Sequence, residues 1–152
     1  IHTRQPVVLP SRVDDGLLAW LRGLPWPVAI VLHANHAREL DASVATALAR
    51  LRETGAQLLN QSVLLRGVND SRDALVALSE RLFECGVVPY YLHVLDPVRG
   101  SAHFDVPDDE ARALHADLTA VLPGYLVPRL VREVPGAAHK VSIASAGPPP
   151  AG

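Results

Sequence analysis

The sequence predicts an α/β fold in which parallel βα repeats form the second half of a partial (β/α) barrel. Its short apolar runs lack polar alternation, which is typical of strands that are buried on both faces. Between these runs, apolar residues recur at helical spacing, so a helix connects each strand to the next. A closed eight-stranded barrel needs about 250 residues. The 152 residues can therefore form only part of one.

The first half of the chain predicts two βα units. An apolar run at 6–9 is expected to be the first strand, and leucines at helical spacing predict a helix over 14–22. The next strand is expected at 28–32. It leads to a helix over 41–54, which Gly55 ends because glycine readily adopts the left-handed conformation of a helix C-cap.

The second half continues the same alternation. Its predicted elements are strands within 57–65 and at 88–94 and 125–131, and helices over 72–85 and from Pro107 to about 123. Tyr90 and Tyr91 are expected on opposite faces of their strand. The domain is expected to cover 1–143, and the low-complexity residues 144–152 are expected to be a disordered tail.

Composition narrows the classes of function. Lys and Arg number 14 and Asp and Glu number 16, so no basic surface indicates nucleic acid or an anionic membrane as a partner. No apolar run reaches the roughly 18 residues of a membrane helix. Cys85 is the single cysteine and cannot form an internal disulfide, which favours a reducing, cytoplasmic setting. The chain opens without a signal-like segment or a methionine, so we expect it to begin within a domain.

An acid and a lysine follow the last two predicted strands. Asp96 opens a loop of about a dozen residues, longer than most βα connections and typical of a working loop. Lys140 follows the fifth predicted strand. Because parallel strands bring their carboxyl ends to one edge, both side chains are expected to face one cavity. The phosphate-binding patterns GxGxxG and GxxxxGK[ST] and the hydrolase pattern GxSxG are absent from the sequence.

Five segments in order resemble the carboxyl-terminal half of the lysine 2,3-aminomutase family of radical S-adenosylmethionine enzymes. They read HTRQPVVLPSR, HANHAREL, LLNQSVLLRGVND, PYYLHVLDPVRGSAHFDVP and GYLVPRLVREVPGAAHK. The branch that makes β-lysine for modification of elongation factor P is the most similar. The resemblance covers about residues 1–143 and implies an isomerase that converts L-lysine to β-lysine by a radical 1,2-amino shift.

The resemblance also implies three cofactors: S-adenosylmethionine, a [4Fe–4S] cluster and pyridoxal phosphate. The family binds its cluster through CxxxCxxC, and this chain lacks that motif, so the cluster ligands are absent from it. Lys140 matches the lysine that holds pyridoxal phosphate covalently. Taken alone, without the matching motifs, Lys140 is read as a surface lysine near a mobile tail. The family's glycine-rich stretch before this lysine is replaced here by Ala137, Ala138 and His139.

Other matched positions imply substrate and cofactor contacts. Asp96 and Glu133 match the carboxylates that hold the distal ammonium of lysine, although Asp96 also suits a turn and Glu133 can pair with Arg132. For the phosphate of pyridoxal phosphate, the expected contacts are Arg4 and Arg12. For S-adenosylmethionine, they are first His33 and Gln61, and then His36, Asn35 and Asn60. His93 and His103 are either site residues or structural histidines. No metal site is expected, because His33 and His36 have no third ligand nearby in sequence.

Two other functions remain open at this point. The chain can be a catalytically silent fragment that acts only in an assembly, with a missing half or as a homo-oligomer. It can also be a βα-repeat enzyme that uses pyridoxal phosphate without radicals. In the leading interpretation, the partner is a small molecule, lysine.

Overall fold

The computed structural model describes residues 1–96, 100–134, 136–137 and 139–143. Its strands are β1 (His2–Thr3), β2 (Ala29–Leu32), β3 (Gln57–Val63), β4 (Val88–His93), β5 (Arg129–Arg132) and β6 (Val141–Ser142). Its α-helices are α1 (Gln5–Val8), α2 (Asp15–Arg22), α3 (Ala42–Arg52), α4 (Arg72–Glu84) and α5 (Asp108–Val121). Short 3-10 helices lie at Pro10–Arg12, Ala37–Glu39, Ala102–Phe104 and Gly124–Leu126. The predicted tail, 144–152, lies outside the described residues.

The strands form one sheet in the order β1-β2-β3-β4-β5-β6, and the first five are parallel. Strands that follow each other in sequence are therefore neighbours in space, as in one arc of a (β/α) barrel. The predicted α/β class with parallel βα repeats is confirmed. The sheet is not entirely parallel, because β6 pairs antiparallel with β5.

The prediction of a first strand at 6–9 is wrong. The backbone N–H groups of Val7 and Val8 both donate to the Arg4 carbonyl, at 3.0 Å each, so this run is the short helix α1. Proline is tolerated in a first helical turn, and a short buried apolar run does not by itself distinguish helix from strand. The first strand is instead β1, whose register pairs His2 with Val31. Arg12 consequently follows a helix, not a strand end.

The other predicted helices are confirmed, and side-chain caps explain where they begin. The carboxylates of Asp14 and Asp41 accept hydrogen bonds from backbone N–H groups of α2 and α3, each at 2.9 Å. Ser71 caps α4 in the same way. Gly55, with φ of 87°, follows α3 in the left-handed conformation that the sequence predicts. Among the described residues, no helix has the length and apolar character needed to cross a membrane.

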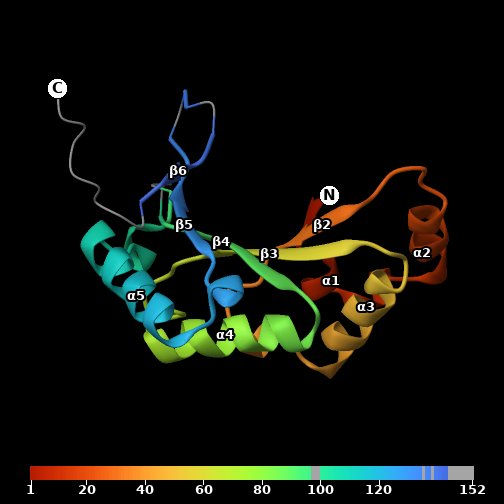
Figure 1. Ribbon diagram of the computed structural model, residues 1–152, viewed down its shortest axis with the longest axis horizontal. Coiled ribbons are helices and arrows are strands. Elements are labelled where there is room, and N and C mark those ends of the chain that lie inside the picture. Colours follow the sequence, from red (N-terminus) through yellow and green to blue (C-terminus); the bar gives the residue numbers. More distant parts are fainter. Residues whose placement is uncertain (97–99, 135, 138, 144–152) are drawn as a thin grey trace.

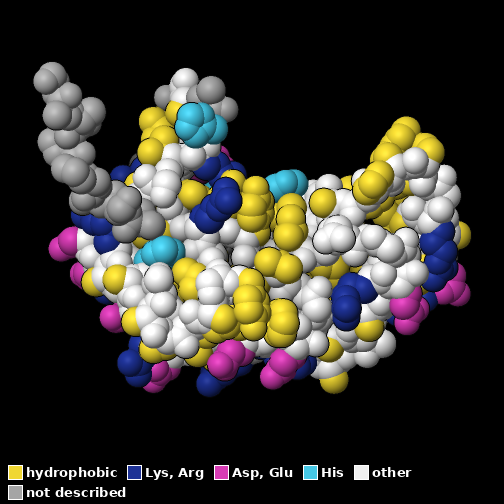
Figure 2. All heavy atoms as spheres, in the orientation of Figure 1, with side chains coloured by type: hydrophobic (Ala, Val, Ile, Leu, Met, Phe, Trp, Pro, Cys, Tyr) yellow, Lys and Arg dark blue, Asp and Glu magenta, His cyan; other side chains and the backbone are white. Residues whose placement is uncertain are grey.

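The helices cover one face of the sheet and leave the other face open. Figure 1 shows α1, α3, α4 and α5 beneath the curved sheet, with the β5–β6 hairpin rising from its upper side. Leu32, Leu48 and Leu82 belong to the apolar core under the first half of the sheet, and Leu92 and Leu130 to the core under the second half. In Figure 2, acidic and basic side chains gather along the lower margin, over the helices.

A bulge in β4 changes the placement of its two tyrosines. The register with β3 shifts between Asn60 and Gln61, so that Pro89 and Tyr91 face consecutive partners. The extra residue, Tyr90, breaks the two-residue alternation of the strand. The rings of Tyr90 and Tyr91 lie 3.9 Å apart between centroids, and the expectation that they point to opposite faces is wrong.

Candidate functional site

The open face of the sheet holds a hollow at the carboxyl ends of β3, β4 and β5. It has a volume of about 290 Å³. Its lining residues are Gln61, Val63, His93, Val94, Leu95, Asp96 and Glu133. In register, Val63 pairs with His93 and His93 with Val131, which places these three side chains in one row on one face. Asp96 and Glu133 thus open into the same hollow, as the strand order predicts.

Lys140 lies at the margin of this hollow. Its ammonium group donates a hydrogen bond to the carboxylate of Glu133 and lies 5.6 Å from the centroid of the Tyr91 ring. The ion pair lowers the pKa of Glu133, chiefly through this hydrogen bond. Lys140 immediately precedes β6, so the antiparallel hairpin, which sequence reasoning missed, brings the lysine back beside β5.

His93 forms the buried centre of the site. Its side chain is 7% exposed, and its ring lies 5.7 Å from that of Tyr91. Burial lowers the pKa of His93, and the nearby Lys140 charge lowers it further, while Glu133 and Asp96 act in the opposite direction. The imidazole is therefore neutral at pH 7.

Three buried polar atoms on this face have no hydrogen-bond partner among the described residues. They are Nε2 of His33, Oε1 of Gln61 and Nε2 of His93. Leu32 pairs with Asn60, so His33 extends the row of Gln61 across the neighbouring strands. Buried polar groups are normally satisfied, and a set of unpaired ones on a single face indicates a place for a polar ligand.

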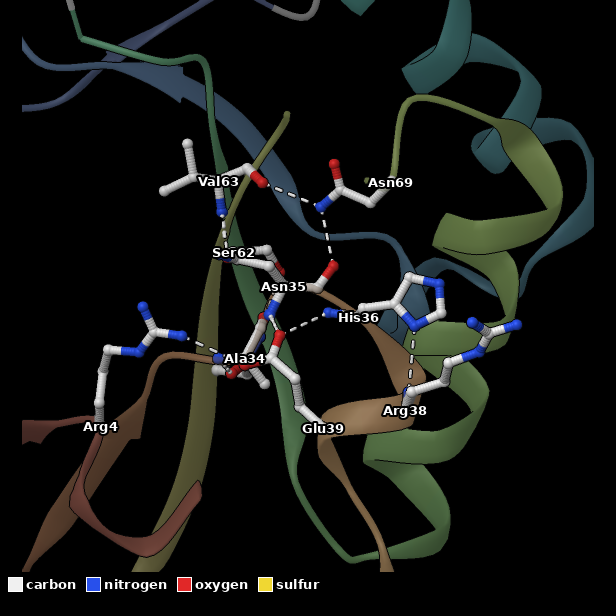
Figure 3. A network of polar contacts seen from close by, with 10 residues as sticks. Arg4, Ala34, Asn35, His36, Arg38, Glu39, Ser62, Val63 and Asn69 are labelled. Atoms are coloured by element: carbon white, nitrogen blue, oxygen red, sulfur yellow. Dashed lines mark hydrogen bonds and ion pairs between the residues drawn. The ribbon is translucent and has the colours of Figure 1, made fainter. Parts of the chain in front are cut away.

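A network of asparagine side chains holds the loops at this edge of the sheet (Figure 3). The Asn69 amide donates to the carbonyls of Asn35 and Val63, at 2.8 and 2.9 Å. The Asn35 carboxamide oxygen accepts from the N–H of Val63, and Asn60 exchanges two hydrogen bonds with the backbone of Ala34. These contacts give Asn35 and Asn60 a structural part at the rim of the site.

Arg4 and His36 also take part in this rim. Arg4 forms an ion pair with Glu39 at 3.2 Å, and the Glu39 carboxylate accepts hydrogen bonds from the N–H groups of Asn35 and His36. The His36 ring caps the short helix that follows, because its Nδ1 accepts from the N–H of Arg38 at 3.1 Å (Figure 3). Both residues therefore shape the loop after β2.

Arg12 lies apart from these residues. It lines a different hollow, of about 420 Å³, with Val13, Leu17, Trp20 and Leu51 among its neighbours. This hollow lies against α2, and none of its lining residues contributes to the one that holds Asp96. The structure thus brings together Asp96, Glu133, Lys140 and Gln61, and leaves Arg12 elsewhere.

Sequence reasoning left the part of His93 open and did not assign Tyr91 to the site. The signal available for His93 was its position in the strand that leads to Asp96. For metal binding, no group of three His, Cys, Asp or Glu side chains suited to hold an ion occurs among the residues that the structure describes.

The buried His93 and the half-buried His33 predict a pH dependence of stability. Burial is the largest cause of the lowered pKa of both His33 and His93. In the unfolded chain, a histidine titrates near about 6.5. Below that pH, the unfolded state binds protons that the folded state does not. The free energy of unfolding is therefore retained above the pKa of the unfolded histidine, and it falls as the pH drops through that pKa. Urea unfolding at pH 8, 6 and 5 should show this decrease in the free energy of unfolding. The decrease should be smaller in His93→Gln. An equal decrease in that variant would contradict the prediction.

Comparison with known proteins relates the chain to one group of enzymes. No protein-family model matches it. It is 48% identical to the L-lysine 2,3-aminomutase of Escherichia coli over 143 residues, which are 94% of this chain and 42% of that protein. It is 45% identical to that of Haemophilus influenzae over 140 residues, covering 92% of this chain and 41% of that protein, and 36% identical to that of Clostridium subterminale over 143 residues, covering 94% and 34%.

A solved structure supports the fold. A radical SAM methyltransferase from Sphaerobacter thermophilus matches 77% of this chain and 37% of its own, with a TM-score of 0.57 and 17% sequence identity. The chain spans about two fifths of the length of the aminomutases from E. coli and H. influenzae. Over nearly all of its residues, it is a homologue of the L-lysine 2,3-aminomutases.

Proposed function

We propose that this chain is the carboxyl-terminal half of an isomerase that converts L-lysine to β-lysine. The observation that carries the proposal is the hollow shared by Asp96 and Glu133, with Lys140 paired to Glu133 at its margin. An ammonium group inside a protein needs carboxylate partners, because an unpaired buried charge costs several kcal/mol. Two carboxylates in one hollow suit the distal ammonium of lysine. The 48% identity with an L-lysine 2,3-aminomutase supports this substrate.

The residues present fit pyridoxal phosphate. Lys140 has a side chain that is 26% exposed and lies over an aromatic ring, so its amine is within reach of a ligand in the hollow. A lysine amine is the nucleophile that binds this cofactor. Arg4, near the carboxyl end of β1, and Arg12 are the proposed phosphate partners, and the separate position of Arg12 makes Arg4 the better placed of the two.

His33 and Gln61 fit the proposed contacts to S-adenosylmethionine, because each presents a buried polar atom that has no partner in the described part of the chain. His36 is a weaker candidate, since its Nδ1 already caps a helix. When bound, S-adenosylmethionine and a [4Fe–4S] cluster supply the radical, and pyridoxal phosphate carries the migrating amino group. With one cysteine, this chain holds too few thiolates for such a cluster, so the ligands would come from other residues of the complete protein.

The residues of this chain would bind and orient the substrate. Asp96 and Glu133 hold the distal ammonium, which fixes how far the reacting carbons lie from Lys140. The proposed use of β-lysine is the modification of elongation factor P.

The proposal predicts a large effect of Asp96→Asn in the complete protein, assayed with S-adenosylmethionine, pyridoxal phosphate, a reductant and L-lysine. Losing a carboxylate that pairs with a buried ammonium should lower kcat/KM for β-lysine formation by on the order of 100-fold or more. Asp73→Asn, a change of an exposed acid on α4, serves as the control. Absence of β-lysine from the unaltered protein would exclude the proposed function, and an equal activity of Asp96→Asn would remove Asp96 from it.

A catalytically silent role is the second candidate, and it holds if the complete protein, like this chain, lacks the three cysteines of a cluster motif. In that case the chain contributes only within an assembly. Iron analysis and detection of 5′-deoxyadenosine in the complete protein distinguish the two, because a silent protein yields neither.

A further inference from the structure

We propose that His93 is a substrate-binding residue that accepts the third hydrogen bond of the distal ammonium of lysine, beside Asp96 and Glu133. The inference rests on the proposed function and deepens it. It assigns to the site a residue that determines preference for a primary ammonium group.

His93 is buried at the edge of the sheet where the hollow lies. Nε2 of His93 is buried and has no hydrogen-bond partner among the described residues. A buried polar atom left unpaired costs about 1–3 kcal/mol, so a binding partner in the hollow would relieve that cost. His93 lines the hollow together with Asp96 and Glu133. A ligand held by the two carboxylates would therefore lie in the hollow that His93 lines.

The distal ammonium group of lysine can donate three hydrogen bonds. It carries three N–H donors and no acceptor. Two carboxylates accept two of these hydrogen bonds, and the third needs an acceptor without positive charge. A neutral imidazole offers one lone pair. Burial is the largest cause of the lowered pKa of His93; Lys140 and His33 lower it further, while Glu133 and Asp96 raise it. A lowered pKa favours the neutral ring.

Among the described residues that line the hollow, Gln61 also has a buried acceptor without a partner, and the sheet register distinguishes it from His93. Gln61 pairs with Tyr91, whereas His93 pairs with Val63, two residues nearer the carboxyl edge. Asp96 lies three residues beyond His93 at that edge. His93 is therefore the acceptor on the side of the carboxylates, and Gln61 lies further back along the strand.

The test compares two ligands that differ only in the distal amine. The complete protein, loaded with pyridoxal phosphate, is titrated with L-lysine and with L-2-aminohexanoic acid, and binding is followed by the cofactor absorbance. His93→Leu should weaken binding of lysine on the order of 10- to 100-fold and leave binding of the apolar analogue within about threefold. His93→Gln should retain most of the lysine affinity, because its carboxamide oxygen reaches about as far as Nε2 and is neutral.

His115→Gln is the matched control. The Nε2 of His115 already contacts the Pro128 carbonyl at 2.9 Å, outside the hollow, so this change should not alter the ratio of the two affinities. If the ratio of the affinity for lysine to that for L-2-aminohexanoic acid is unchanged in His93→Leu, the inference is overturned. A ratio lowered by Gln61→Leu but not by His93→Leu would transfer the role to Gln61 and also overturn it. If the unaltered protein fails to bind lysine more tightly than the analogue, the proposed function itself fails.

Discussion

Lys140→Ala should abolish covalent capture of pyridoxal phosphate and lower turnover of lysine on the order of 1,000-fold or more, because the amine proposed to bind the cofactor is removed. Borohydride reduction followed by peptide mass spectrometry measures the capture. The same change removes the main cause of the lowered pKa of Glu133, which should return toward its ordinary value. An adduct that persists at the same stoichiometry in Lys140→Ala would show that a different amine of the protein holds the cofactor.

Lys140→Arg separates the chemistry of the amine from the ion pair. Arginine keeps a permanent positive charge opposite Glu133 but does not serve as an amine nucleophile at neutral pH. The variant should therefore unfold at nearly the same urea concentration as the unaltered protein, since the charge opposite Glu133 is kept and this ion pair is partly exposed. It should nevertheless show no trappable adduct. A large loss of stability in Lys140→Arg would mean that the lysine serves the fold and not the cofactor.

Asn69→Ala should destabilise the protein by about 2–4 kcal/mol, because three backbone groups lose their partner at a fully buried position. The Asn69 side chain is 0% exposed, donates to the carbonyls of Asn35 and Val63, and accepts from the N–H of Leu65 at 2.7 Å. Urea unfolding measures the effect as a lower midpoint with an unchanged slope.

Asp70→Ala, at the next position, is the matched control for Asn69→Ala. The Asp70 carboxylate accepts from the N–H of Gly67 at 2.8 Å and pairs with Arg66 at 3.4 Å, near the surface. Its loss should cost about 1 kcal/mol or less. Equal destabilisation by the two alanine changes would contradict the structural role assigned to the asparagine network.

Helices with a clear apolar stripe and a capping side chain were predictable because their signals are local. Asp41, the apolar positions of α3 and Gly55 all lie within one short segment, so no distant contact is needed to place that helix. The run at 6–9 was not predictable in this way. Its apolar residues suit a buried strand or a buried helix, and the hydrogen bonds to the Arg4 carbonyl decide for the helix.

The site residues also divide into those that the local sequence could place and those that it could not. Asp96 could be placed at the carboxyl edge from the strand that precedes it. The rest of the site depends on contacts between segments distant in sequence: β6 returns to β5, and the bulge at Tyr90 alters the alternation before His93. Short strands such as β6 carry little periodicity, and a bulge is set by the pairing strand.

By itself, the sequence determined the βα alternation after residue 14, the approximate bounds of α2, α3, α4 and α5, and the resemblance to the aminomutases, because these depend on local spacing and on motif order. Tertiary structure alone decided that Lys140 pairs with Glu133, that Nε2 of His93 is buried with no partner among the residues the structure describes, and that Arg12 lies in another hollow. Pairing and burial arise where strands distant along the chain meet, and no local pattern specifies the atoms that are brought into contact there.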